Sequence, residues 1–246
     1  MKKQRIDQLL CERGLAESRT RAQAMIMAGI VLAAGQRVEK PSELFPPEVE
    51  IRVKGVGPQL RYASRGGLKL EAALKAFRIS VEEKICLDIG SSTGGFTDCL
   101  LEHGAKKVFA VDAGTNQMIW RLRNDPRVEL KEKTNARFLK PKDFPELLDI
   151  VVMDVSFISV RKILPVIRPL MHQFGRLIVL IKPQFEVGKG EVGKGGIVRE
   201  PEKHERVIQE IREFAEVCDL TERGVIRSPI TGANGNQEFL AVYEAI

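Results

Sequence analysis

Several features that would mark a secreted, membrane or metal-binding protein are missing from these 246 residues. The four cysteines are scattered, with no Cys-x-x-Cys pair, which argues against a disulfide framework or a zinc site and favours a reducing compartment. The longest purely apolar runs, such as residues 177–181, are far too short to span a bilayer. No apolar signal segment follows the opening Met-Lys-Lys-Gln-Arg. We therefore expect a cytoplasmic protein with no membrane span and no bound metal.

Two common phosphate-binding motifs are also missing. The glycines at 90, 94 and 95 do not fit Gly-x-Gly-x-x-Gly, and Phe96 stands where a P-loop would have lysine. What is present is Cys86-Leu-Asp-Ile-Gly-Ser-Ser-Thr-Gly-Gly-Phe-Thr97, an apolar run, a Gly/Ser/Thr turn and the start of a second apolar segment. This order predicts strand, turn and helix, in which backbone and free helix N–H groups approach a ligand closely.

The apolar patterning downstream predicts further alternation of strands and helices. A buried strand is expected at 107–112, further strands at 128–133, 148–154 and 176–182, an amphipathic helix at 202–217, and a last strand after residue 238. A helix is also expected just upstream, at 68–77. The pattern indicates an α/β, Rossmann-like fold, in which chemistry is placed at the carboxyl ends of the strands.

The positive charge is concentrated near the N-terminus. Residues 1–64 hold 11 Lys or Arg against 7 Asp or Glu, so a quarter of the chain carries most of the formal excess of +6. Helical spacing begins at Ile6, Ser18 is a suitable N-cap for a second helix, and a hairpin at 30–38 and a strand at 49–53 follow. Residues 54–58 have linker composition, which predicts domains 1–58 and 59–246. Such charge favours a polyanionic partner.

Motifs in this first segment resemble the S4 RNA-binding domain over roughly residues 5–53. They are Arg5-Ile-Asp-Gln-Leu-Leu, Gly14-Leu, Ser18-Arg-Thr-Arg-Ala, Gly29 and Val31. The resemblance implies a small α+β module whose arginines, here Arg5, Arg19 and Arg21, contact RNA phosphates. A merely solvated basic helix face is the alternative. The chain departs from the family at Ser42-Glu-Leu-Phe-Pro-Pro, so that corner is expected to be reshaped.

The Gly-rich turn led by Asp88 resembles motif I of S-adenosylmethionine (SAM) methyltransferases. That resemblance implies that Asp88 and the loop bind SAM. The next strand ends in Asp112, whose carboxylate would accept hydrogen bonds from the ribose hydroxyls of SAM, and Asn135 could bond the adenine. The alternatives are structural roles: an ordinary βα turn for the Gly-rich stretch, a cap for Asp112, and a turn-forming residue for Asn135. The predicted cofactor set is Asp88, Gly90, Ser91, Ser92, Thr93, Gly94, Gly95, Asp112 and Asn135.

Four separated residues, Lys69, Asp154, Lys182 and Glu238, complete the pattern. Their order resembles the tetrad of FtsJ-like RNA 2′-O-ribose methyltransferases. With the S4 module in front, the chain resembles the TlyA family, also labelled haemolysin A, over essentially its whole length. The most specific motifs are Ser64-Arg-Gly-Gly-Leu-Lys-Leu, Asp88-Ile-Gly-Ser-Ser-Thr-Gly-Gly-Phe-Thr, Asp154-Val-Ser-Phe-Ile-Ser, Ile181-Lys-Pro-Gln-Phe-Glu and Gly235-Asn-Gln-Glu-Phe. The resemblance implies SAM-dependent methylation of cytidine 2′-hydroxyls in ribosomal RNA, 16S, 23S or both.

These residue types suit that reaction. A ribose hydroxyl is a weak nucleophile, and a lysine amine can take its proton only if the lysine pKa falls well below about 10.4. Partial burial and a neighbouring cation have that effect. We expect Lys182 to accept the proton, Lys69 to be the neighbouring cation, Asp154 to orient Lys182, and Glu238 to hold Lys69 or the ribose. No metal is required.

Three more basic residues, Arg65, Lys189 and Lys194, are expected to meet RNA phosphates. The two lysines lie in the loop at 186–196, which either closes over RNA or is a disordered surface loop. Two other functions stay open: a non-catalytic binder of ribosomal RNA, against which the intact tetrad argues, and the pore formation implied by the haemolysin label. Neither the methylated nucleotide nor the oligomeric state follows from the sequence.

Overall fold

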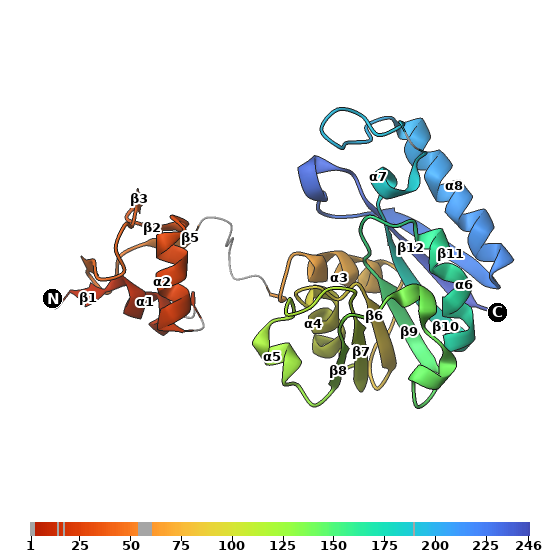
Figure 1. The fold of residues 1–246 in the computed structure, drawn as a ribbon, viewed down its shortest axis with the longest axis horizontal. Helices are drawn as coiled ribbons and strands as arrows, with labels where there is room; N and C mark the ends of the chain where they lie inside the picture. The colour runs from red at the N-terminus through yellow and green to blue at the C-terminus, as the bar shows by residue number, and fades with distance from the viewer. Residues whose placement is uncertain (1–2, 14, 17, 54–60, 189) are drawn as a thin grey trace. The chain divides into compact units, whose positions relative to one another are not determined.

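The computed structural model describes residues 3–13, 15–16, 18–53, 61–188 and 190–246, and it divides into two compact units. The first comprises Met1–Arg61 and the second Tyr62–Ile246 (Figure 1). The expected division at residue 58, within the expected linker at 54–58, falls outside the described residues and stays a prediction. Within the described ranges, no helix is both long and apolar enough to cross a bilayer.

The small unit packs two helices against short strands, as the sequence pattern predicted. Its core consists of apolar residues from both helices and from the strands, among them Leu10, Ile26 and Val31. Ser18 caps the second helix by accepting a hydrogen bond from the backbone N–H of Arg21 at 3.2 Å. The elements are β1 (Gln4–Arg5), α1 (Ile6–Glu12), α2 (Arg19–Met27), β2 (Val31–Ala33), β3 (Gln36–Arg37), β4 (Leu44–Phe45) and β5 (Ile51–Val53).

The strands of this unit form two small antiparallel sheets. β2 lies between β3 and β5, which confirms the predicted hairpin, and β1 pairs with β4. The β1–β4 pair was not predicted, because each strand has only two residues and no alternation is readable over that length. The pair lies at the corner where the chain departs from the S4 pattern.

The large unit is built on a seven-stranded sheet of order β11-β12-β10-β9-β6-β7-β8. The five strands from β6 to β10 run parallel, while β12 runs antiparallel to both of its neighbours. The strands are β6 (Ile85–Ile89), β7 (Lys107–Val111), β8 (Val128–Lys131), β9 (Leu148–Met153), β10 (Met171–Ile181), β11 (Leu220–Arg227) and β12 (Phe239–Ala245). The predicted α/β, Rossmann-like fold is confirmed.

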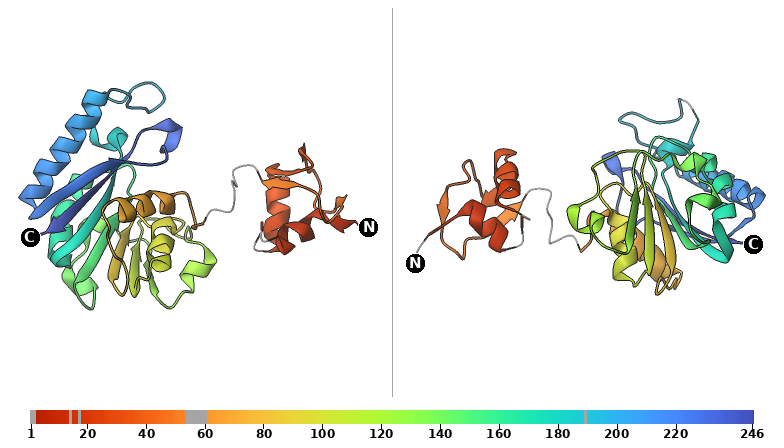
Figure 2. Two further views of the ribbon diagram at one scale, coloured as in Figure 1. Left: turned by 180° about the vertical axis from the view of Figure 1, so that it is seen from behind. Right: turned by 60° about the horizontal axis from the view of Figure 1, so that its bottom comes forward.

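Helices cover both faces of this sheet (Figures 1 and 2). Successive residues of a strand point to opposite faces, so Val151 and Met153 belong to the core on one face and Val152 to the core on the other. One face carries α3 (Gly66–Ala76), α4 (Gly95–Glu102) and α5 (Trp120–Arg123), and the other carries α6 (Leu164–Ile167) and α8 (Pro201–Val217). The buried strands therefore read as continuous apolar runs.

The parallel strands bring several polar positions to one edge of the sheet. Gly90 follows β6, Asp112 follows β7, Asp154 follows β9 and Lys182 follows β10. Because β12 runs in the opposite sense, the residue before it, Glu238, reaches the same edge. This topology places the candidate site.

Candidate active site

The Gly-rich loop between β6 and α4 owes its glycines to packing within the protein. Gly90 has φ +81°, and a Cβ there would overlap the carbonyl oxygen of Asp154. Gly94 has φ +98°, and a Cβ there would overlap Leu122. Both backbone conformations are strained for any residue with a side chain. The loop is therefore shaped by contacts with the residues after β9 and with α5 before any ligand is considered.

Asp88 lies beneath the loop. Its side chain is fully buried, and the hydroxyl of Thr97 on α4 donates to its Oδ2 at 2.6 Å. Burial raises the pKa of Asp88 to about 7, and the nearby Asp154 carboxylate acts in the same direction. The carboxyl group lines neither of the two cavities described next. The predicted direct contact between Asp88 and the cofactor therefore has no support in the geometry, which gives Asp88 a place under the loop.

Two adjacent cavities open at the carboxyl edge of the sheet. The first has a volume of about 360 Å³ and the second about 410 Å³. Ser91, Thr93 and Gly95 line the first, whereas Gly94 lines neither. Both cavities are lined by Gly90, Ser92, Asp154, Ser156 and Phe157. A ligand extending from one to the other would therefore pass the Gly-rich loop and the residues after β9.

The second cavity contains the two residues predicted to bind adenosine, Asp112 and Asn135. The Asp112 carboxylate accepts hydrogen bonds from the backbone N–H groups of Ser92 at 2.8 Å and Gly114 at 2.6 Å. Since an ionised carboxylate has about four acceptor positions, it retains capacity for hydroxyl donors. Asn135 caps a short 3₁₀ turn, η1 (Ala136–Phe138), by accepting from the N–H of Arg137 at 3.1 Å. Asn135 can therefore cap this turn and also contact a ligand in the second cavity.

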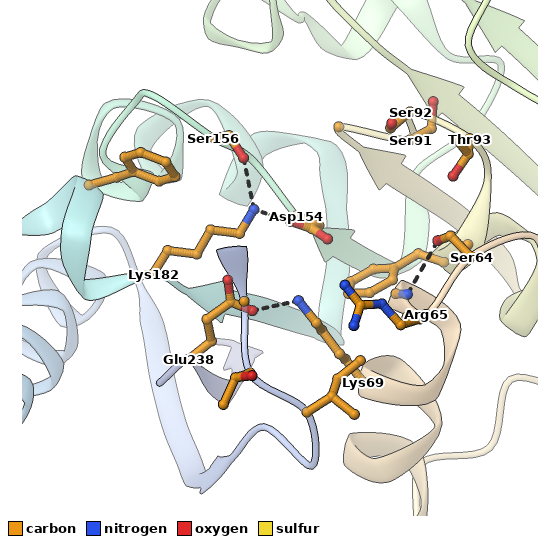
Figure 3. Close-up of a pocket in the computed structure, with 18 of the residues that line it drawn as sticks. Ser64, Arg65, Lys69, Ser91, Ser92, Thr93, Asp154, Ser156, Lys182 and Glu238 are labelled. Atoms are coloured by element: carbon orange, nitrogen blue, oxygen red, sulfur yellow. Dashed lines mark hydrogen bonds and ion pairs between the residues drawn. The ribbon is translucent and has the colours of Figure 1, made fainter. Parts of the chain in front are cut away.

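The four residues of the predicted tetrad all line the first cavity, where they form two ion pairs (Figure 3). Lys182 Nζ lies 2.6 Å from Asp154 Oδ1 and donates to Ser156 Oγ at 2.9 Å. Lys69 Nζ, on α3, donates to Glu238 Oε2 at 2.5 Å. All four side chains are largely shielded from solvent. Each buried charge therefore has a partner of opposite sign, as the low dielectric of such a site requires.

Neighbouring residues keep these pairs in place. A Cβ at Gly232 would overlap the Glu238 carboxylate, so the glycine leaves room for that side chain. Lys182 immediately precedes the short helix α7 (Pro183–Glu186), whose last residue, Glu186, accepts from Ser159 Oγ at 2.6 Å and from the N–H of Val160 at 2.8 Å. Burial raises the pKa of Glu186. These bonds tie the segment after β9 to the one after β10.

Sequence reasoning missed two residues of the site, Ser156 and Phe157. Ser156 and Phe157 lie within the quoted motif Asp154-Val-Ser-Phe-Ile-Ser, but motif matching gave them no role. Phe157 is 91% exposed with φ +63°, and its ring centroid lies 5.0 Å from that of Phe185. An exposed phenylalanine in the left-handed region is unusual and cannot be read from a local pattern. Ser91, which belongs to the predicted cofactor set, lines the first cavity, and its buried hydroxyl forms no hydrogen bond within the described residues.

The predicted RNA contacts fall in three places. Arg65 lines the first cavity beside Lys69 (Figure 3). In the small unit, Arg21 is exposed on α2, while Arg5 and Arg19 both contact Asp7. Lys194 is exposed, and Lys189 lies outside the described residues.

The loop around Lys194 is held by hydrogen bonds to the turn before β12. Asn236 donates to the carbonyl of Gly196 at 2.8 Å and accepts from the N–H of Val198 at 3.1 Å. Asn234 donates to the carbonyl of Gly195 at 3.1 Å. These bonds argue against the disordered alternative for the described residues 190–196, and closure of the loop over RNA stays a prediction.

No group of three or more His, Cys, Asp or Glu side chains that could hold a metal ion is found among the residues that the structure describes. The four cysteines are free thiols.

Comparison with known proteins gives the family. The FtsJ-like methyltransferase model matches residues 62–244 and the S4 domain model matches residues 4–51. The candidate rRNA methyltransferase YqxC of Bacillus subtilis is 51% identical over 97% of this chain and 85% of its own length. The 16S/23S rRNA (cytidine-2′-O)-methyltransferase TlyA of Mycobacterium tuberculosis is 42% identical over 96% of this chain and 87% of its own.

A solved structure agrees. A candidate hemolysin from Streptococcus thermophilus aligns with a TM-score of 0.76 at 46% identity, covering 100% of this chain and 89% of its own. The S4 and FtsJ-like models match the first and the second compact unit respectively, and the relatives extend across both units. The chain therefore belongs to the TlyA family, also called haemolysin A, of FtsJ-like methyltransferases that carry an S4 domain.

Proposed function

We propose that this protein transfers a methyl group from SAM to the 2′-hydroxyl of a cytidine in ribosomal RNA. The observation that carries the proposal is the convergence of Lys69, Asp154, Lys182 and Glu238 in one cavity, as two ion pairs beside the Gly-rich loop. The substrate follows the name of the M. tuberculosis relative, whose identity to this chain extends across both units.

The second cavity has the chemistry that SAM needs. Asp112 and Asn135 offer acceptors for ribose and a donor and acceptor for adenine, and apolar side chains such as Val111 and Ile158 line the same cavity. In the first cavity, Ser91 supplies a buried hydroxyl that has no hydrogen-bond partner among the described residues. Bound SAM would supply an electrophilic methyl group on a sulfonium ion.

Residues of the first cavity then have to activate the ribose hydroxyl. As the methyl carbon bonds to the 2′-oxygen and its bond to sulfur breaks, the hydroxyl proton must move to a base. Lys182 Nζ is the proposed acceptor, held between Asp154 Oδ1 and Ser156 Oγ. The second pair, Lys69 with Glu238, supplies a fixed cation and a carboxylate for orienting the ribose.

Phe157 gives the RNA a place to bind at the cavity mouth. Unpaired RNA bases stack on aromatic side chains, and this ring is exposed beside Phe185 while lining both cavities. Arg65 would meet the adjoining phosphate. The S4 unit would add affinity for the surrounding ribosomal RNA.

The direct test is transfer of radiolabelled methyl from SAM to 16S and 23S ribosomal RNA, offered both as transcripts and in ribosomal subunits, followed by mapping of 2′-O-methyl positions. We expect label on ribose of one or a few cytidines. RNA binding without any transfer would favour the non-catalytic alternative, and label on a base instead of ribose would refute the assigned reaction.

A further inference from the structure

An acidic side chain is buried in the small unit, although that unit is basic overall. Asp7, on α1, has no exposed surface, yet the unit it belongs to carries most of the excess positive charge of the chain. A buried carboxylate is costly unless it is hydrogen-bonded and paired. Since an apolar residue would suit a core position better, this acid needs an explanation beyond packing.

Three side chains from two segments converge on this carboxylate. Arg5 donates through Nε to Oδ1 at 3.0 Å and through Nη2 to Oδ2 at 2.9 Å, a bidentate pair. Arg19 Nη2 and Gln23 Nε2, both from α2, donate to Oδ2 at 3.2 Å and 3.1 Å. The Arg5 hydrogen bonds, with help from Gln23 and Arg19, hold the pKa of Asp7 well below its usual range. The carboxylate is therefore charged at any pH at which RNA is bound.

The two guanidinium groups are only partly used by Asp7. The Arg5 side chain is 37% exposed and that of Arg19 is 53% exposed. A guanidinium has five N–H donors, so Nη1 of Arg5 and Nε and Nη1 of Arg19 are not engaged by the carboxylate. One buried negative charge thus holds two positive groups next to each other, which would otherwise repel, and leaves donors facing solvent.

We infer that Arg5 and Arg19 form a single preorganised site for one RNA backbone phosphate, with Asp7 as its positioning residue. Fixing the two side chains in advance removes the entropy that flexible arginines lose on binding. The planar forks then offer convergent N–H groups, the geometry that suits a phosphate. The inference rests on the proposed RNA function and adds which residues act as a unit and what holds them.

The test uses a variant for which two models predict opposite changes in RNA affinity. Asp7→Asn adds one positive charge to the unit, so a model in which only net charge matters predicts tighter binding and a steeper salt dependence. Preorganisation predicts the reverse: affinity for transcribed 16S and 23S ribosomal RNA should fall roughly tenfold, and the salt slope should flatten by about 0.7 for each single-stranded phosphate that the protein no longer neutralises. Glu12→Gln, an exposed acid on the same helix, is the matched control, and its loss of charge should tighten binding slightly.

Asp7→Asn could unfold the small unit, and hydrogen exchange of residues 3–53 in the full chain would reveal this. A second pair of variants keeps the test valid in that case. Arg5→Lys and Arg19→Lys preserve charge but lose the fork, so preorganisation predicts several-fold weaker RNA binding for each. Arg52→Lys, an exposed arginine on β5, should bind like wild type. Unchanged affinity in both lysine variants, or tighter binding by folded Asp7→Asn, overturns the inference.

Wild-type protein measured in parallel separates this result from the proposed function. A wild type that binds and methylates ribosomal RNA, with Asp7 variants that bind as tightly, refutes only the preorganised site. A wild type that neither binds nor methylates refutes both.

Discussion

At the scale of single residues, the two lysines of the cavity have different surroundings. Lys182 is held by two oxygens of the segment after β9, whereas Lys69 donates to one buried carboxylate from the segment before β12. Removal of Lys69 would leave Glu238 buried without its cation, at a cost to stability. Asp154 is more exposed than Glu238, so Lys182 is the residue whose replacement reports most directly on chemistry.

Lys182→Ala should lower the single-turnover rate of methyl transfer by a factor on the order of 10² to 10⁴, because proton transfer matters mainly in the transition state. Affinities for SAM and RNA should change little. Lys182→Arg keeps the positive charge but cannot give up its proton at accessible pH, so it should be nearly as inactive as Lys182→Ala.

Rapid-quench kinetics of the wild type and the two variants would decide whether Lys182 acts as a base or as a positioning charge. An arginine variant that transfers methyl groups near the wild-type rate would leave Lys182 as a positioning charge and remove it as the base.

Asp88 allows a separate prediction about stability. Its folded-state pKa of about 7 lies above that of an unfolded aspartate, about 3.9, so its contribution is fully present below the lower value and is lost as pH rises through about 7. Asp88→Asn cannot ionise and should escape this loss. The thermal midpoint of the variant relative to wild type should therefore increase between pH 5 and pH 8 (about the window of this titration).

Asp125→Asn is the control for that measurement. The hydrogen bond from Arg127 lowers the pKa of Asp125, so its contribution is present at high pH and is lost as pH falls through the lowered value. Its replacement should give no gain at pH 8. If the thermal midpoints of wild type and Asp88→Asn differ by the same amount at every pH in this range, Asp88 is not held in its neutral form.

At the scale of elements, the glycines of the Gly-rich loop were expected to allow close approach to a ligand, but packing within the protein already requires them. Gly94→Val would place a side chain on Leu122, at φ +98°, and should destabilise the fold before it affects any ligand. The loop glycines are therefore poor probes of cofactor binding. Asp112, which lines the second cavity, is a better one.

Asp112→Ala should weaken SAM binding on the order of tenfold, since hydrogen bonds to a charged acceptor contribute about 1.5–3 kcal/mol. Isothermal titration calorimetry would measure it. Glu132→Ala removes a carboxylate that likewise accepts a backbone N–H, from Asn116, but lines neither cavity, and it should bind SAM normally. Equal effects in the two variants would assign the loss to loop distortion.

The segment after β9 carries the prediction for RNA. Phe157→Ala should raise the ribosomal RNA concentration needed for half-maximal rate roughly tenfold, because stacking contributes about 1–3 kcal/mol per base. Phe157→Tyr keeps the ring and should retain activity. Phe174→Ala is a close control, since Phe174 is also exposed and also has positive φ, at +65°, but lies near the start of β10 outside both cavities. Steady-state kinetics with RNA varied would separate them.

The elements that could be predicted from the sequence are those whose environment is uniform along the chain. Strands β6, β7 and β9 and the second half of β10 are largely buried and read as apolar runs, so their ends, and hence Asp154 and Lys182, could be placed. β11, at the edge of the sheet, was missed because Leu220–Arg227 is half-exposed and mostly polar, and its pattern follows its contact with β12 and α8. The Asp7 cluster and the burial of Asp88 likewise depend on contacts made only in the folded chain.

At the scale of the whole molecule, the chain separates its tasks between two compact units. The tetrad and both cavities belong to Tyr62–Ile246, and the excess positive charge lies mainly in residues 1–64. Net charge alone would attract RNA to any part of the surface. The separation therefore predicts that equal changes of charge in the two units have unequal effects on RNA binding.

Arg21→Glu in the small unit should weaken binding to ribosomal RNA and flatten its salt dependence, while SAM affinity stays unchanged. Arg21 suits this test better than Arg19, because a glutamate at position 19 would also face the buried Asp7. Arg78→Glu makes the same change of charge on an exposed arginine just after α3, outside the first cavity, and should have a much smaller effect. Fluorescence anisotropy at several salt concentrations would measure both slopes. If the two variants lose affinity equally, RNA is attracted by the net charge of the molecule, and the S4 unit has no dedicated phosphate-binding face.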